Sequence, residues 1–405
     1  MGIRGLPPAP PSASSPLGGD AASGPAEPVL RRPLDGVLSR RQLLLLGAGL
    51  AGLPSAFAAR TSTTLVAAWQ QDGEQHIGLL RCDETRWTVQ HALRLPTRAH
   101  GLWCEAGGSV LAVARRPGDW LLRWQPRSGA TQWHWIDSDR RFNGHVIASA
   151  DGTTLRTTET DLDTALGRIG VRDAASLEKT TEWATHGMDP HQLLALPQAV
   201  HGLPAGTLMV ANGGIPTLPE TGRAKRELGR MDASLVALHP ATGALLGQWR
   251  LDDPYLSIRH LAWDARAQTL GIALQAEHLD KAAQAGAPVL AVWDGRGLRA
   301  AEGQPPLAGY GGDICALPGG GFGVSCPREN RLALFDAQGR WRGAIEHREA
   351  YALASDGEDW WLASTLGQVG WLHGGAPSPA ARPVLPARTT QPALQLDNHW
   401  LLAAR

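Results

Sequence analysis

From about residue 63 onward, the chain alternates apolar and polar residues in short stretches that are separated by turns rich in Gly, Asp and Pro. Alternation with a period of two is typical of β-strands, in which successive side chains point to opposite faces of a sheet. A helical pattern occurs only around Leu279–Ala285. The pattern therefore predicts an all-β protein.

Two kinds of hairpin alternate along this region. One kind turns at an Asp or Pro that is often followed by Gly, as in "LLRWQPRSGATQWHW" and "LVALHPATGALLGQW". The other kind is exemplified by "HGLWCEAGGSVLAVAR" and "RHLAWDARAQTLGIALQ", and each kind occurs seven times. Four-stranded units of about 40–50 residues in tandem are the blades of β-propellers.

The arrangement of the repeats predicts how the ring closes. With the strands of a blade lettered A to D outward from the axis, six complete units run from Ala99 to about Arg388. A C–D unit (His76–Leu95) and an A–B unit (Ala393–Arg405) are left over and complete a seventh. The strand that begins at Thr63 and the segment "HWLLAAR" both resemble strand B of this shared blade, and only one of them can occupy that position. We therefore expect a seven-bladed β-propeller with four-stranded blades, closed by the two ends of the chain; a pair of β-sandwiches would not explain the alternation.

The segment "LSRRQLLLLGAGLAGLPSAFAAR" has the features of an export signal. Arg40 and Arg41 precede an apolar run that is shorter than the roughly 20 residues of a membrane span, and Ala56-Phe57-Ala58 supplies a cleavage site. The arginine pair resembles the twin-arginine (Tat) signal. Residues 39–58 are thus predicted to be a Tat-type signal peptide, and the mature protein is predicted to lie in the periplasm of a Gram-negative bacterium without a transmembrane domain.

The remaining residues divide into two parts. Residues 1–38 are rich in Pro, Ala, Gly and Ser and are expected to be disordered, or to be an extension from a misassigned start codon. Residues 59–405 are expected to form the single propeller domain.

Composition narrows the possible functions. Lys plus Arg and Asp plus Glu both number 38, and no basic cluster is present, so a nucleic-acid partner is not expected. The four cysteines form no CxxC motif, which excludes a zinc ribbon, a thioredoxin-like redox motif and a c-type haem attachment site. Cys315 and Cys326 lie on the two strands of one hairpin, where they form either a disulfide or two buried thiols.

Functional side chains gather at the mouth formed by the D–A and B–C connections. His opens strand A in four units, and imidazoles from neighbouring blades can bind a transition metal such as iron, copper or zinc, with carboxylates as further ligands. Arginines at the same mouth suit an anion or a metal chelate instead. The candidate ligand residues are His100, His145, Glu159, Asp161, His186, His191, Asn212, Arg259 and His260.

A structural reading of the same residues stays open, because a Gly-His pair before strand A can simply tie the strands of a blade together. No GxSxG, Walker or HExxH motif is present, so the chain is not assigned as an enzyme. The long segment Asn212–Asp232 is expected to cover the mouth or to contact a partner.

The strings "FNGH", "TETDLD", "IGVRDA", "HGMDPHQL", "VANGGI", "TGRAK", "SLV" and "LSIRHLA" resemble the bacterial domain-of-unknown-function family 1513. The resemblance implies a Tat-exported periplasmic propeller that is encoded near imelysin-type iron-uptake proteins. It carries over no catalytic residue.

Three functions follow as hypotheses. The first is a binding or accessory protein for iron acquisition, with periplasmic iron-uptake proteins as partners and a metal, a chelate or a small ligand at the mouth. The second is a metal-dependent hydrolase, lactonase or oxidoreductase that uses the same mouth. The third is a protein-interaction scaffold without a small ligand.

Overall fold

The computed structural model describes residues 62–83, 85–216, 227–373, 382–385, 387–388 and 394–403, all within one compact unit that spans Arg60–Arg405. The predicted extension and signal peptide, and residues 217–226 of the predicted insertion Asn212–Asp232, lie outside the described residues.

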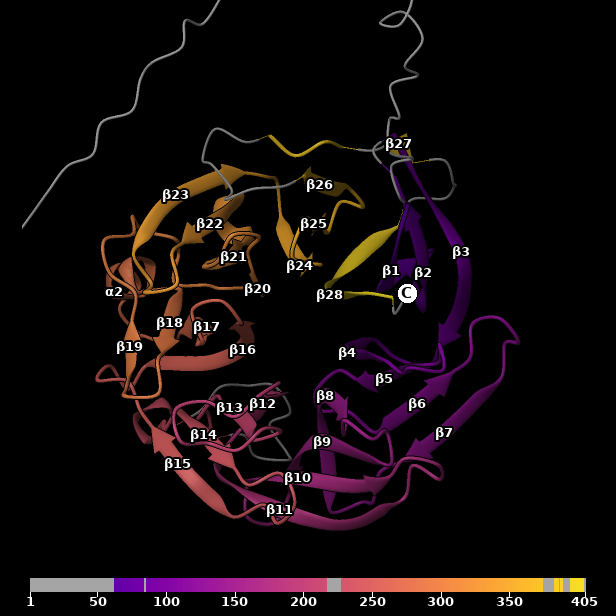
Figure 1. Cartoon of the computed structure of the whole chain (residues 1–405), viewed down its shortest axis with the longest axis horizontal. Helices are drawn as coiled ribbons and strands as arrows, with labels where there is room; N and C mark the ends of the chain where they lie inside the picture. Colours follow the sequence, from indigo (N-terminus) through magenta and orange to yellow (C-terminus); the bar gives the residue numbers. More distant parts are fainter. Residues whose placement is uncertain are drawn as a thin grey trace, which may run out of the picture. The chain divides into compact units, whose positions relative to one another are not determined.

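The described residues form seven sheets arranged in a ring (Figure 1). The prediction of a seven-bladed β-propeller is therefore confirmed. The strands nearest the axis, one from each blade, are β28 (Gln395–Leu402), β4 (Ala99–Cys104), β8 (Arg140–Ala148), β12 (Pro190–Ala195), β16 (Leu256–Asp264), β20 (Ile314–Ala316) and β24 (Ala350–Ser355).

Five blades continue outward through three further antiparallel strands. These are β5 (Val110–Ala114), β6 (Trp120–Trp124) and β7 (Thr131–Trp135) in blade 2; β9 (Thr154–Asp161), β10 (Leu166–Asp173) and β11 (Lys179–Met188) in blade 3; and β13 (Leu208–Asn212), β14 (Ser234–Leu238) and β15 (Leu245–Trp249) in blade 4. They are β17 (Thr269–Ala276), β18 (Leu290–Trp293) and β19 (Leu298–Ala300) in blade 5, and β21 (Phe322–Cys326), β22 (Arg331–Phe335) and β23 (Trp341–Glu346) in blade 6.

Blade 7 contains β24, β25 (Asp359–Ser364) and β26 (Val369–His373), and an isolated bridge from Val384 to Trp371 continues it outward. Short helices interrupt the connections: α2 (Lys281–Gly286) overlaps the predicted helical stretch, and the 3₁₀ helices η2 (Leu228–Arg230) and η3 (Pro327–Glu329) lie between strands B and C of blades 4 and 6.

Blade 1 combines strands from both ends of the described chain. β28 pairs with β1 (Thr63–Gln71), which continues through β2 (Glu74–Cys82) and β3 (Arg86–Leu95) to the two-residue β27 (Ala387–Arg388). β1 is thus strand B. The expected A–B hairpin over Ala393–Arg405 is wrong, because β28 is one continuous strand in which Asp397-Asn398, a turn-like pair, lies at a register shift.

Seven buried hydrophobic clusters hold the ring together, one between each pair of neighbouring blades. Alternation along a strand divides its side chains between two clusters: Leu65, Ala67 and Trp69 face blade 7, whereas Val66 and Ala68 face blade 2. Each blade is therefore apolar on both faces, and buried tryptophans contribute much of the apolar area between them.

The same two-sided packing decides between the two alternatives for the cysteine pair, in favour of buried thiols. Cys315 and Cys326 are free thiols. Cys315 is paired with Gly323, not with Cys326, and it packs toward blade 7. Cys326 packs toward blade 5, and burial raises its pKa to about 12. The two sulfurs thus belong to different interblade clusters.

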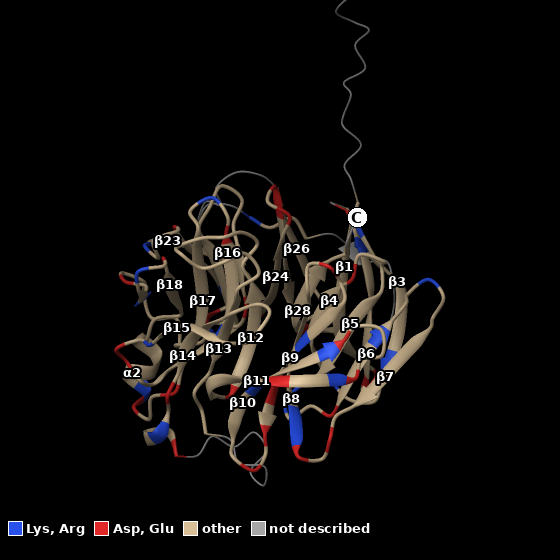
Figure 2. Cartoon of the chain, turned by 60° about the horizontal axis from the view of Figure 1, so that its bottom comes forward, with Lys and Arg blue, Asp and Glu red and all other residues tan. Residues whose placement is uncertain are grey.

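Lys and Arg positions are interspersed with Asp and Glu positions along the ribbon in Figure 2, on loops as well as on strands. Among the described residues, no helix is both long and apolar enough to span a bilayer.

Candidate functional site

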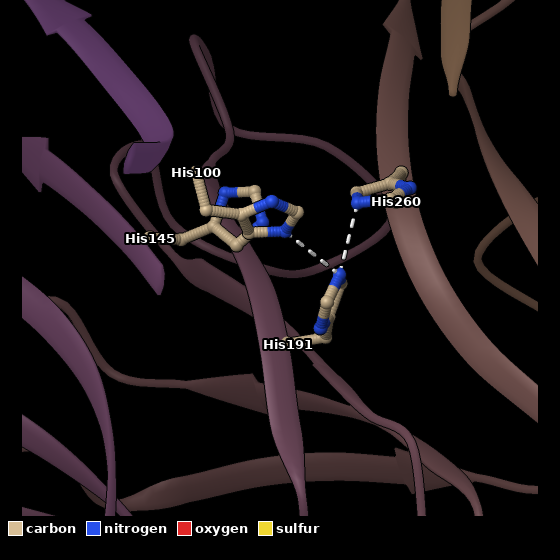
Figure 3. Close-up of side chains that lie close together, drawn as sticks. All are labelled: His100, His145, His191 and His260. Carbon is tan, nitrogen blue, oxygen red and sulfur yellow. Dashed lines mark hydrogen bonds between the residues drawn. The ribbon is translucent and has the colours of Figure 1, made fainter. Parts of the chain in front are cut away.

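Five histidines meet near the propeller axis, each from the inner strand of a different blade. Blades 1 to 5 supply them in order. They are His399 on β28, His100 on β4, His145 on β8, His191 on β12 and His260 on β16. Figure 3 shows the last four pointing toward one another from separate strands.

A β-bulge in each of these inner strands accompanies its histidine. Pairing between the inner strand and its neighbour shifts register at or beside every one of the five positions. A bulge adds a residue to one strand, bends it and re-aims the side chain at that point. The recurrent bulge therefore explains how strands that otherwise pack between blades each bring one imidazole to the axis. Tyr351 of blade 7 lies in the corresponding shift of β24.

Two glycines allow β4 and β8 to approach each other at this level. A Cβ on Gly101 would lie 2.3 Å from the carbonyl oxygen of Gly144. Gly144 has a φ of +102°, and a Cβ there would lie 2.7 Å from Cδ2 of His100. The Gly-His pairs in the sequence thus reflect close backbone contact as well as histidine placement.

Two pairs of imidazole nitrogens lie at the spacing of ligands to one ion. Nε2 of His191 lies 3.3 Å from Nε2 of His100 and 2.9 Å from Nε2 of His260. With His145 included, one nitrogen from each ring falls within 4.8 Å of all the others. Nitrogens bound to one zinc ion at about 2.0–2.1 Å lie about 2.9–3.4 Å apart for ordinary bond angles. The two measured distances fall in this interval.

Burial keeps the four imidazoles neutral. It holds the pKa of His100, His145, His191 and His260 well below the usual value, and neighbouring imidazoles lower each pKa further. Neutral imidazole is the form that binds metals. Nε2 of His145 is buried and has no hydrogen-bond partner in the described protein, so its lone pair is available at the cluster.

His399 was not among the residues predicted from sequence. Its ring centroid lies 4.3 Å from that of His260 and 4.5 Å from that of His100. Its Nδ1 lies 3.3 Å from Oδ1 of Asp313, while its Nε2 is buried without a hydrogen-bond partner in the described protein. A carboxylate that accepts from one ring nitrogen orients the other toward a metal in many metal sites. His399 is thus a fifth candidate ligand.

A cavity of about 240 Å³ borders the histidines on the side of the D–A and B–C connections. His100, His191 and His260 line one part of it, and arginines line much of the rest. The arginines are Arg115, Arg116, Arg259 and Arg328. The mouth that the topology indicated therefore contains both imidazole and guanidinium groups.

Asp189 organises two of these arginines. Its carboxylate is fully buried and pairs with Arg116 and, at 2.9 Å, with Nη1 of Arg259. Arg259 is itself buried, and burial lowers its pKa. Arg259 thus belongs to the site, as predicted, but through the cavity rather than through the histidine cluster.

The structure does not bring the predicted carboxylates to the histidines. Glu159 is buried against Arg172 at 2.7 Å and Lys179 at 3.5 Å. Asp161 pairs with Arg168 at 3.1 Å. Both therefore neutralise cations of their own blade, and neither joins the group of nitrogens that can hold a metal.

Two other predicted residues also lie apart from the cluster. His186 is exposed, with a left-handed φ of 55°, and its carbonyl accepts from Gln248. Asn212 is buried and donates to the carbonyl of Thr185 at 2.8 Å, a contact that ties blade 4 to β11 of blade 3.

The residues present fit a transition metal. Imidazole nitrogens are preferred ligands of zinc, copper, nickel and iron, and four of them from four strands form a preorganised set. The neutral rings and the lone pair of His145 meet the chemical requirement. A metal-free alternative is also compatible with the distances, in which Nε2 of His191 accepts a hydrogen bond from His100 or from His260.

Fold and site together define a seven-bladed β-propeller with a histidine cluster at one end of its axis, beside an arginine-lined cavity. The chain belongs to the family described as "Protein of unknown function (DUF1513)", whose model matches residues 93–403.

Solved structures of several other propellers are similar to this chain. Virginiamycin B lyase from Staphylococcus aureus is 12% identical, with a TM-score of 0.49 over 69% of this chain and 82% of that one. A streptogramin B lyase structure is 13% identical, with a TM-score of 0.49 over 67% and 78%. A chain of the mitotic checkpoint complex is 12% identical, with a TM-score of 0.47 over 68% and 76%. No curated protein matched the sequence.

Proposed function

We propose that this protein is a periplasmic metal-binding propeller that serves iron acquisition as a binding or accessory protein. Its metal site consists of His100, His145, His191 and His260, and His399 adds a fifth imidazole. The observation that carries the proposal is the convergence of four imidazole nitrogens within 4.8 Å, from rings that burial keeps neutral.

The periplasmic location rests on the signal-like segment around Arg40-Arg41. Iron as the physiological metal rests on the genetic setting that the family resemblance implies, since imidazole ligands alone do not distinguish iron from copper or zinc. A partner among periplasmic iron-uptake proteins belongs to the same proposal.

The metal site is tested by metal content. Mature protein is purified from periplasm, and iron, copper and zinc are measured by mass spectrometry in wild type, in His100→Ala/His191→Ala and in His186→Ala. We expect about one metal ion per chain in wild type and in His186→Ala, because His186 is exposed and outside the cluster. The double variant should retain less than a tenth of that amount.

Two further measurements make the result decisive. Near-ultraviolet circular dichroism, which reports the buried tryptophans, shows whether each variant is folded. Folded wild type that binds none of the three metals, even when titrated with each, would overturn the proposal and identify the cluster as a hydrogen-bonded imidazole network.

His399→Gln tests the fifth ligand. It removes the ring that Asp313 orients, and metal affinity should fall at least tenfold, since mutating the outer-shell partner of a ligand alone typically costs about 10–100-fold. Unchanged affinity in this variant would restrict the site to the other four histidines.

A further inference from the structure

The cavity beside the histidine cluster contains more positive charge than its surroundings balance. Four arginines line it, and no Asp or Glu is among the lining residues. Asp189, buried behind the wall, pairs with Arg116 and Arg259, and Glu277 also acts on Arg259. The four guanidinium groups of the lining are thus balanced by two carboxylates.

Two of the arginines have no such partner among the described residues. No side-chain hydrogen bond or ion pair holds Arg115 in the described part of the chain. Arg328 is exposed and lies over the ring of Tyr310, with its guanidinium carbon 4.2 Å from the ring centroid. Stacking on an aromatic ring fixes the plane of a guanidinium group and leaves its N–H groups free to donate.

Arg259, another guanidinium group in the cavity lining, is buried. Arg259 is only 2% exposed, and its Nε has no hydrogen-bond partner in the described protein. A buried charged group without its full set of acceptors is costly. An oxyanion in the cavity would lower this cost by placing negative charge beside the guanidinium group.

Size limits what this anion can be. The cavity of about 240 Å³ is smaller than the roughly 300–1,000 Å³ of pockets for drug-sized ligands. Its lining contains both imidazoles and guanidinium groups. A molecule with two carboxylates can therefore reach both groups at once, and Arg binds carboxylates with two parallel hydrogen bonds.

We infer that the cavity binds a small dicarboxylate, with one carboxylate on the metal held by the histidines and the other on Arg115 and Arg328. This inference rests on the proposed metal site. It makes the ligand of the propeller a metal–carboxylate complex rather than a bare ion.

Calorimetric titration of the mature protein with malonate tests the inference, using zinc as a redox-inert probe metal. Zinc-loaded wild type should bind malonate at least tenfold more tightly than metal-free protein does. Arg115→Gln/Arg328→Gln should weaken malonate binding at least tenfold while zinc stoichiometry stays unchanged. Arg127→Gln/Arg296→Gln is the matched control, since it removes the same charge from exposed turns at the other mouth and should behave as wild type.

The outcomes separate the two proposals. Zinc binding without malonate binding overturns the dicarboxylate inference alone. Acetate binding as tightly as malonate would show that the second carboxylate is not used, and orthophosphate binding more tightly would assign the cavity to phosphate; either result overturns the inference. If wild type does not bind zinc, copper and iron are titrated in its place, and absence of binding for all three overturns the metal site, whatever malonate does.

Discussion

Four of the histidines near the axis, His100, His145, His191 and His260, are buried as neutral groups, and this has a cost that depends on pH. Protonating any one of them would place a cation among neighbouring imidazoles, and for His191 and His260 also close to Arg259. The fold therefore tolerates these side chains only in the form that can bind a metal. A further histidine, His347 in the connection before β24, is also buried as a neutral group, because burial lowers its pKa to about 4.

His347 gives a prediction for pH dependence. Between pH 6.5 and 4 the unfolded chain takes up a proton on this histidine and the folded chain does not, so the free energy of unfolding falls as pH falls. We expect metal-free His347→Gln to lose about 2 kcal/mol less than wild type between pH 7 and pH 4.5, as measured by urea unfolding.

His91→Gln serves as the control for that comparison, because His91 is exposed on β3. Its loss of stability over the same pH interval should equal that of wild type. If the free energy of unfolding falls equally with pH in wild type and in His347→Gln, His347 is not buried as a neutral group.

At the scale of the strand, the bulges decide which histidines meet. Four strand-A histidines were predicted from the sequence because each stands at the start of a repeated hairpin. His399 was not, because Asp397-Asn398 reads as a turn, whereas it lies at a register shift inside β28. A bulge of one or two residues has no reliable signature in alternation, so the sequence cannot show which way these side chains point.

The carboxylates of Glu159 and Asp161 illustrate a second limit on predicting the site from the sequence. Glu159 and Asp161 precede a B–C connection, as predicted, and topology places that connection at the correct mouth. Their partners come from the next strand or beyond it, Arg168 and Arg172 on β10 and Lys179 on β11. Repeat spacing reveals which blade a residue belongs to, but cross-strand pairing decides whether its charge is already neutralised.

Gly144 allows a test of the strand geometry. In Gly144→Ala the new methyl group meets His100, and the φ of +102° is strained for Ala. We expect the melting temperature to fall and metal affinity to drop at least tenfold, because His100 must move.

Gly152→Ala is the control for strain alone. Gly152 also has a positive φ, +71°, but a Cβ there has no atom within 4 Å. This variant should lose stability and keep wild-type metal affinity in the same titration. Equal affinities for the two variants would show that close contact between β4 and β8 does not position His100.

For the whole molecule, stability depends on seven interblade clusters, and β28 belongs to the one between blades 7 and 1. It contributes Leu396 and Trp400 there, against Ala352, Trp361 and other residues of blade 7. The strand also pairs with β1, which would otherwise present an unpaired edge toward the axis. The C-terminal strand is thus expected to couple two blades that are far apart in sequence.

Trp400→Ala tests this coupling. The side chain is 2% exposed, and removing a buried Trp typically costs about 3–5 kcal/mol. Trp135→Ala is the matched control, since Trp135 is 56% exposed and its loss should change stability by less than about 0.5 kcal/mol. Hydrogen exchange should accelerate in β24–β26 as well as in β1–β3 of the Trp400 variant. Acceleration confined to blade 1 would show that the cluster does not transmit stability around the ring, and that blade 7 is held by its contacts with blade 6 alone.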